Sequence, residues 1–90
     1  MTFEYDPAKS QTNAQKHGID FQTAQALWED ENLIQLVSKQ PLDEPRWLVI
    51  GRIGTKHYTA IITYRGDAIR IISVRRSREN ERRLYESQRT

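Results

Sequence analysis

The chain has 90 residues, of which 37% are hydrophobic and 29% are charged, and it contains no cysteine. A chain of this length forms one core and buries roughly 60–65% of its unfolded surface, so we predict a single domain over residues 1–90 with its function on an open face. The lack of cysteine excludes a disulfide framework and a thiolate zinc site. Two well-separated histidines do not predict a metal site, and we expect no cofactor. Neither a signal peptide nor an apolar run of roughly 20 residues is present, so we expect a cytoplasmic protein with no membrane partner.

The charge is unevenly distributed. The net charge is +2, but residues 1–45 hold three Lys or Arg against eight Asp or Glu, and residues 46–90 hold eleven against four. All ten arginines lie from Arg46 onward. A basic half of this kind favours a polyanionic partner. The alternative interpretation is a solvated surface on which the charges cluster by chance.

Two helices are predicted in the first third of the chain. Asp6 and Pro7 are typical of a helix start and Gly18 of a helix end, so the first helix should cover 7–17. Asp20 should cap a second helix. Its large apolar residues recur at helical spacing and should face the core. They are Phe21, Ala24, Leu27 and Trp28.

From Leu33 onward the hydrophobic period changes to two, which predicts strands. The four strands expected are Leu33–Val37, Arg46–Arg52, His57–Arg65 and Ile69–Arg76. Residues 40–45 should connect the first two. Gly54-Thr55 and Gly66-Asp67 are typical of tight hairpin turns, so the strands should form an antiparallel meander.

Ser77 should cap a last helix that runs to about Gln88. A further short strand is possible at Phe3–Tyr5. Together these elements predict an α+β fold: a four-stranded antiparallel sheet, with or without the short N-terminal strand, two N-terminal helices on its apolar face, and a C-terminal helix.

Two-residue turns also fix which residues lie opposite each other. The first hairpin should pair Arg52 with His57, and the second should pair His57 with Arg76. One sheet face should then be apolar and the other cationic. The basic residues expected on the second face are five arginines and a histidine: Arg46, Arg52, His57, Arg65, Arg70 and Arg76. Neighbouring like charges destabilise a sheet, which favours a bound anion over a merely soluble surface. Arg75 should point away from Arg76 unless the strand ends or bulges there.

Several strings of the sequence, in order and with the expected spacing, resemble the BrnT family of type II toxins. The strings are Phe3-Glu4-Tyr5-Asp6-Pro7-Ala8-Lys9, Lys16-His17-Gly18-Ile19-Asp20-Phe21, Arg46-Trp47-Leu48-Val49-Ile50-Gly51-Arg52, Arg70-Ile71-Ile72-Ser73-Val74-Arg75-Arg76 and Glu81-Arg82-Arg83-Leu84-Tyr85-Glu86. The resemblance implies a RelE-like fold and a ribonuclease that stops translation. It also implies a cognate BrnA-like antitoxin, and contact with operator DNA only through the antitoxin complex.

The resemblance further implies functional roles for Arg75 and Arg76, and extends to Arg52, Arg65 and Glu81. We expect Arg46, Arg52 and Arg70 to bind RNA, and Arg76 rather than Arg75 to contact the phosphate that is cut.

Metal-independent RNA cleavage uses the 2′-hydroxyl as nucleophile and needs a base, cations for the charged phosphorane, and an acid. Arginine can supply the cation but not the base, because its pKa is about 12.5–13.8. His57 is the candidate base, and its alternative role is that of an ordinary strand histidine. Glu81 is a second candidate, or it orients Arg75 or Arg76. An enzyme without an efficient base, or a basic module that binds nucleic acid without chemistry, also fits the sequence.

Overall fold

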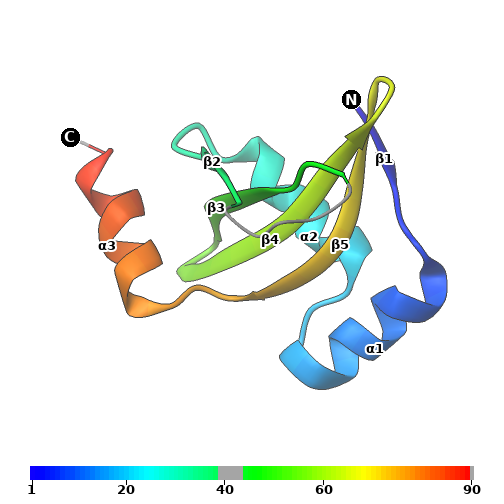
Figure 1. The fold of residues 1–90 in the computed structure, drawn as a ribbon. Coiled ribbons are helices and arrows are strands. Elements are labelled where there is room, and N and C mark those ends of the chain that lie inside the picture. Colours follow the sequence, from blue (N-terminus) through cyan, green and yellow to red (C-terminus); the bar gives the residue numbers. More distant parts are fainter. Residues whose placement is uncertain (39–43, 90) are drawn as a thin grey trace.

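The computed structural model describes residues 1–38 and 44–89 (Figure 1). The elements in chain order are β1 (Thr2–Glu4), α1 (Pro7–His17), α2 (Phe21–Ala24), a 3-10 helix (Gln25–Glu29), β2 (Ile34–Val37), β3 (Trp47–Ile53), β4 (Lys56–Arg65), β5 (Ala68–Arg76) and α3 (Glu79–Ser87). Residues 40–43 of the predicted connection lie outside the described residues. In the described part of the chain, no helix is long and apolar enough to cross a membrane.

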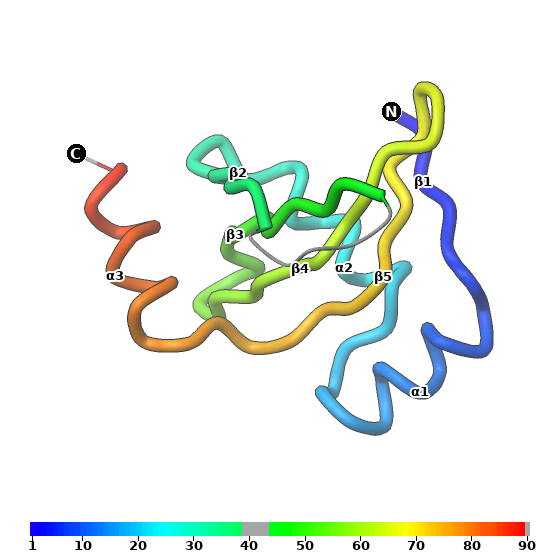
Figure 2. Tube along the Cα trace, in the orientation of Figure 1, coloured from blue at the N-terminus to red at the C-terminus, as the bar shows by residue number. Residues whose placement is uncertain are grey.

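The strands form one five-stranded sheet in the order β1-β5-β4-β3-β2. β2 to β5 make an antiparallel meander, as predicted, while β1 runs parallel to β5 with Thr2 opposite Ala68 and Glu4 opposite Arg70. The N-terminal strand therefore belongs to the sheet, and the α+β prediction is confirmed. Figure 2 shows that the path of the chain places α1 and α3 at opposite ends of the sheet.

The helix boundaries follow the predicted signals. The Asp6 side chain accepts a hydrogen bond from the Ala8 N–H at 2.9 Å, and Gly18 ends α1 with a φ of 74°. Asp20 caps the second helix by accepting from the Thr23 N–H at 2.7 Å. That helix is α-helical for only about one turn and continues as the tighter 3-10 form.

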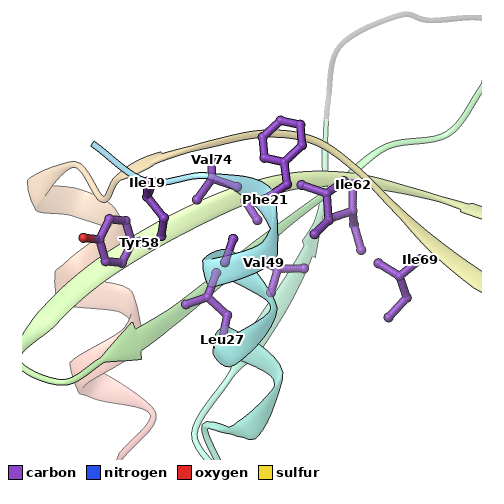
Figure 3. Close-up of a cluster of buried hydrophobic side chains, with 11 residues drawn as sticks. Ile19, Phe21, Leu27, Val49, Tyr58, Ile62, Ile69 and Val74 are labelled. Atoms are coloured by element: carbon purple, nitrogen blue, oxygen red, sulfur yellow. The ribbon is translucent and has the colours of Figure 1, made fainter. Parts of the chain in front are cut away.

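The core lies between these helices and one face of the sheet (Figure 3). Its buried side chains come from α2 and the segments flanking it and from β3, β4 and β5: Ile19, Phe21, Ala24, Leu27, Val49, Tyr58, Ala60, Ile62, Ile69, Ile71 and Val74. Of the four helix residues predicted to face the core, three are fully buried. The fourth, Trp28, is partly buried and packs edge-to-face on Phe3 at a centroid distance of 5.0 Å.

Asn13 on α1 forms hydrogen bonds with the backbone of β5 beyond the point where β1 stops pairing with it. β1 pairs with β5 only as far as Arg70. Beyond it, the Asn13 amide donates to the Val74 carbonyl at 2.8 Å and accepts from the Val74 N–H at 3.2 Å. The same amide donates to the Ile19 carbonyl at 2.8 Å. One buried side chain thus satisfies backbone groups that a further strand would otherwise bind.

Helix α3 covers one end of the opposite sheet face, where Glu81 and Tyr85 are buried. Its N-cap is Arg78 and not Ser77, so this prediction was wrong. The reason is that Glu81, three residues into the helix, accepts from the Arg78 N–H at 2.8 Å, while the Ser77 hydroxyl bonds the Thr59 hydroxyl at 2.9 Å.

Candidate active site on the second sheet face

A β-bulge decides which arginine of β5 faces the site. Near the Gly66 turn the pairing is as predicted, with Thr63 opposite Arg70. The register then shifts between Ile61 and Ile62, so that Ile72 has no partner on β4. One extra residue moves every later side chain to the other face.

The predicted pairing of His57 with Arg76 is therefore wrong. Tyr58 lies opposite Arg76, and Thr59 lies opposite Arg75. Arg75 consequently shares the second face with His57. Arg76 lies on the core face, where its Cζ stands 5.7 Å from the Tyr58 ring centroid. The other hairpin has the predicted register, with Arg52 opposite His57.

Arg75 and Glu81 form a bidentate ion pair at the centre of this site. Arg75 Nη1 donates to Glu81 Oε1 at 2.7 Å, and Nη2 donates to Oε2 at 2.8 Å. The side chains keep only 18% and 9% of their surface exposed, so the pair is largely shielded from water. Parallel N–H···O bonds of this kind fix the orientation of the guanidinium as well as its position.

Glu81 is held ionised by several donors at once. Burial opposes its charge, but the hydrogen bonds from Arg75, the Arg78 N–H and Thr59 outweigh burial and lower the pKa of Glu81 from 4.5 to about 2. The Thr59 hydroxyl, fully buried, contributes its bond at 3.0 Å. The hydrogen bond to Glu81 in turn raises the pKa of Arg75. A carboxylate with so low a pKa is a poor proton acceptor at neutral pH, so Glu81 suits the role of orienting Arg75 better than that of a base.

The bond pattern leaves one edge of the Arg75 guanidinium available. Nη1 uses its two protons on Glu81 and, at 3.3 Å, on the Arg76 carbonyl. Nη2 uses one proton on Glu81. The Nε–H and the second Nη2–H have no acceptor among the described residues, and these two groups lie on the same edge of the planar group. That edge can bind two oxygens of a phosphate side by side.

His57 is held next to this pair by α3. Its Nε2 lies 2.6 Å from Glu86 Oε2, and its ring packs edge-to-face on Tyr85 at 5.2 Å. The hydrogen bond from His57, and to a smaller extent the hydrogen bond from Arg89, lowers the pKa of Glu86. A carboxylate accepts from Nε2–H, so a neutral His57 then carries its lone pair on Nδ1.

Arg52 stands at the open edge of β3, because β2 pairs with β3 only from Trp47 to Ile50. The Arg52 N–H donates to the Asp30 carboxylate at 2.8 Å. Gly51 makes room for this contact, since a Cβ there would lie 2.7 Å from Leu33 Cδ1 and 3.3 Å from Asp30 Oδ2.

The remaining predicted cations of this face gather at its other end. Arg70 donates to Glu4 at 3.2 Å, and Arg65 lies 4.0 Å from Glu4 and 3.7 Å from Glu44. Carboxylates therefore offset the positive charge of Arg65 and Arg70. Arg46 belongs to the same end, and its Nε is buried without a hydrogen-bond partner in the described part of the chain.

The structure thus divides the predicted site residues into groups. Arg75, Glu81, His57 and Arg52 come together around the N-terminal half of β4. Arg46, Arg65 and Arg70 cluster four residues further along β4, which is roughly 13 Å away at the rise of a strand. Arg76 lies on the other face. Sequence reasoning missed four polar partners: Asp30, Thr59, Ser77 and Glu86. For Glu86, the signal available in the sequence was that it lies on the same short helix as Glu81.

The chain matches one protein family. The profile of BrnT, the ribonuclease toxin of a type II toxin-antitoxin system, matches residues 5–81. A search of curated proteins found no match. The matched range covers α1 to β5 and ends at Glu81, so it includes both partners of the central ion pair. The chain therefore belongs to the BrnT family of ribonuclease toxins of type II toxin-antitoxin systems.

Proposed function

We propose that this BrnT chain is a metal-independent endoribonuclease that acts in the cytoplasm and stops translation by cutting RNA. Arg75 binds the phosphate that is cut, and Glu81 holds it in place. The observation that carries this proposal is the available Nε and Nη2 edge of Arg75, on a guanidinium whose other edge is fixed by two short bonds. A preorganised cation of this kind stabilises charge as it develops on a phosphorane.

The chemistry follows from that placement. The 2′-oxygen of the RNA bonds to phosphorus while the bond from phosphorus to the 5′-oxygen breaks, which gives a 2′,3′-cyclic phosphate and a 5′-hydroxyl. His57 Nδ1 accepts the proton of the 2′-hydroxyl, and water returns a proton to the 5′-oxygen. Glu86 supports this role because its bond at 2.6 Å keeps the other ring nitrogen protonated.

The other arginines serve the RNA chain rather than the reacting phosphate. Arg52 lies opposite His57 on the same face and contacts RNA beside the site. Arg46, Arg65 and Arg70 bind RNA at the far end of the face, once the phosphate displaces the carboxylates that now pair with two of them. Arg76 binds a neighbouring phosphate from the other side of β5.

The family implies a cognate antitoxin. We propose that this partner is BrnA-like, that it covers the second sheet face, and that operator DNA is bound only through the complex. The net charge of +7 in residues 46–90 supports an acidic contact surface on that partner.

The test is cleavage of a single-stranded RNA by the purified chain in the presence of a chelator. Arg75→Ala should lower the cleavage rate on the order of 10²–10³-fold. Arg83→Ala is the matched control, because Arg83 is an exposed arginine whose ion pair is with Glu79 on the same helix. Products should carry 2′,3′-cyclic ends, and a DNA strand of the same sequence should remain intact.

Full activity of Arg75→Ala would show that the phosphate is cut elsewhere, and Arg76→Ala then identifies whether the other face is used. Wild-type chain that binds RNA in a salt-dependent manner without forming any product would instead favour the non-catalytic binding module.

A further inference from the structure

A second cationic surface lies outside the site, in a groove between α1 and β5. Its floor and sides are formed by residues of the helix and of the bulged part of the strand: Lys9, Thr12, Asn13, Lys16, His17, Ile72 and Ser73. The groove has a volume of about 210 Å³. One water occupies roughly 30 Å³ in the liquid, so a phosphate group with some of its waters fits.

The basic side chains of this groove have no partner in the part of the chain that the structure describes. Neither Lys9, Lys16 nor His17 makes an ion pair or a side-chain hydrogen bond with any residue in the ranges 1–38 and 44–89. This contrasts with Arg75 and Arg70, which are both paired with carboxylates.

The placement of these cations is not explained by helix stability alone. Lys16 and His17 lie in the last turn of α1, where the helix dipole favours positive charge. Lys9 lies in the first turn, where the dipole disfavours it. Lys9 and Lys16 are seven residues apart, which places them on one stripe of the helix. They are also the only lysines in the first 38 residues, within a half of the chain that has a net charge of −5.

The groove is continuous with the site along β5. After the bulge at Ile72, Ser73 and Arg75 lie on the same face, because they are two residues apart in one strand. Ser73 lines the groove, and its hydroxyl has no hydrogen-bond partner among the described residues. An RNA strand with one phosphate on Arg75 therefore passes the mouth of the groove when it follows β5.

We infer that the groove between α1 and β5 binds a backbone phosphate of the RNA strand next to the phosphate on Arg75. This inference rests on the proposed function for its substrate. Lys9 and Lys16 supply the charge, and Ser73 supplies a donor between them and Arg75.

The experiment measures the affinity of the chain for a 2′-O-methyl RNA oligonucleotide, which has no free 2′-hydroxyl to react, at several salt concentrations. K9Q/K16Q should lower the slope of log affinity against log salt by about 0.7, the value for one phosphate contact on a single strand. K56Q/R83Q removes two exposed cations outside the groove and should keep the wild-type slope. K9R/K16R should also keep it, because the charges remain.

A slope for K9Q/K16Q equal to that of K56Q/R83Q overturns the inference, whether or not the wild-type chain cuts RNA. If that slope is unchanged while K9Q/K16Q binds the cognate antitoxin more weakly, the groove serves a protein partner and the inference is equally overturned. If the wild-type chain shows the expected slopes but does not cut RNA, the inference about the groove stands and the proposed function is refuted instead.

Discussion

The hydroxyl of Tyr85 donates a hydrogen bond to the Asp30 carboxylate at 2.7 Å and joins two segments that are 55 residues apart in the sequence. The same carboxylate oxygen accepts from the Arg52 N–H at 2.8 Å. Burial opposes the charge of Asp30, but the bond from Tyr85 and the backbone bonds outweigh it and lower the pKa of Asp30. Helix α3, which carries Glu81 and Glu86, is thereby fixed against the end of the N-terminal helices.

Tyr85→Phe should lower the free energy of unfolding by about 1.5–3 kcal/mol, because it removes a hydrogen bond to a charged acceptor and keeps the ring. Urea denaturation measures this change. Tyr64→Phe is the matched control, since its hydroxyl bonds the neutral Gln35 at 2.7 Å on the exposed surface. A loss at Tyr85 no larger than that at Tyr64 would show that Asp30 does not hold α3.

Glu81→Gln should lower the free energy of unfolding by about 3 kcal/mol, near the low end for breaking a buried ion pair, because Arg75 keeps some contact with water. Glu79→Gln breaks the exposed pair with Arg83 and should cost less than about 1 kcal/mol. Equal effects of the two substitutions in the same denaturation experiment would contradict the central role of the Arg75–Glu81 pair.

Acid should destabilise the fold through Glu81. In the unfolded chain this carboxyl binds a proton near pH 4.5, whereas in the folded chain its pKa is about 2. The unfolded state therefore binds more protons as the pH falls from 4.5 to 2, so the stability that Glu81 contributes is fully present above pH 4.5 and is lost across this interval. Asp20, Asp30 and Glu86 also have lowered pKa values and act in the same direction.

The contribution of Glu81 is isolated by comparing wild type with Glu81→Gln at a series of pH values. The difference between their unfolding free energies should shrink as the pH falls below 4.5. A difference that stays constant down to pH 2 would mean that the Glu81 carboxyl keeps an ordinary pKa.

His57→Ala should slow RNA cleavage by roughly 10²–10⁴-fold if the histidine is the base. Glu86→Gln should slow it less, because it leaves the ring in place and removes only the group that fixes its tautomer. Both rates are measured on the same RNA, with the melting temperature of each variant as the check on folding. A folded His57→Ala protein with wild-type activity removes His57 from the mechanism.

Asn13→Ala should lower the free energy of unfolding by about 3 kcal/mol, because it leaves buried backbone groups of Val74 and Ile19 without partners. Gln15→Ala, at an exposed position of the same helix, should change stability by less than about 0.5 kcal/mol. Similar denaturation midpoints for the two variants would show that water replaces the Asn13 amide.

Local signals predicted most of the fold. Gly18 ends α1 where expected, and the turns at Gly54 and Gly66 give the predicted pairing close to each turn, because each rests on the conformation of a few neighbouring residues. The parallel partner of β1 was not predicted, since pairing across more than 60 residues leaves no local trace.

The site was predicted less well than the fold. Ile72 is a β-branched residue like Ile71 and Val74, and no glycine or proline marks it as a bulge, so the face of Arg75 could not be read from the pattern. The pairing of His57 with Glu86 depends on where α3 docks, and that position is set by Tyr85 and Asp30. Both features arise from tertiary packing.

The extra residue in β5 bears on how related toxins are compared. Two adjacent arginines lie here on opposite faces of the sheet, and the bulge before them decides which of the two faces the site. In a relative with a strand of the same length in which the residue equivalent to Ile72 pairs with β4, the second arginine would lie on the face that Arg75 occupies here. Aligning the letters of this pair therefore does not establish which arginine of another chain is equivalent to Arg75, and the pairing of β5 with β4 is the better guide.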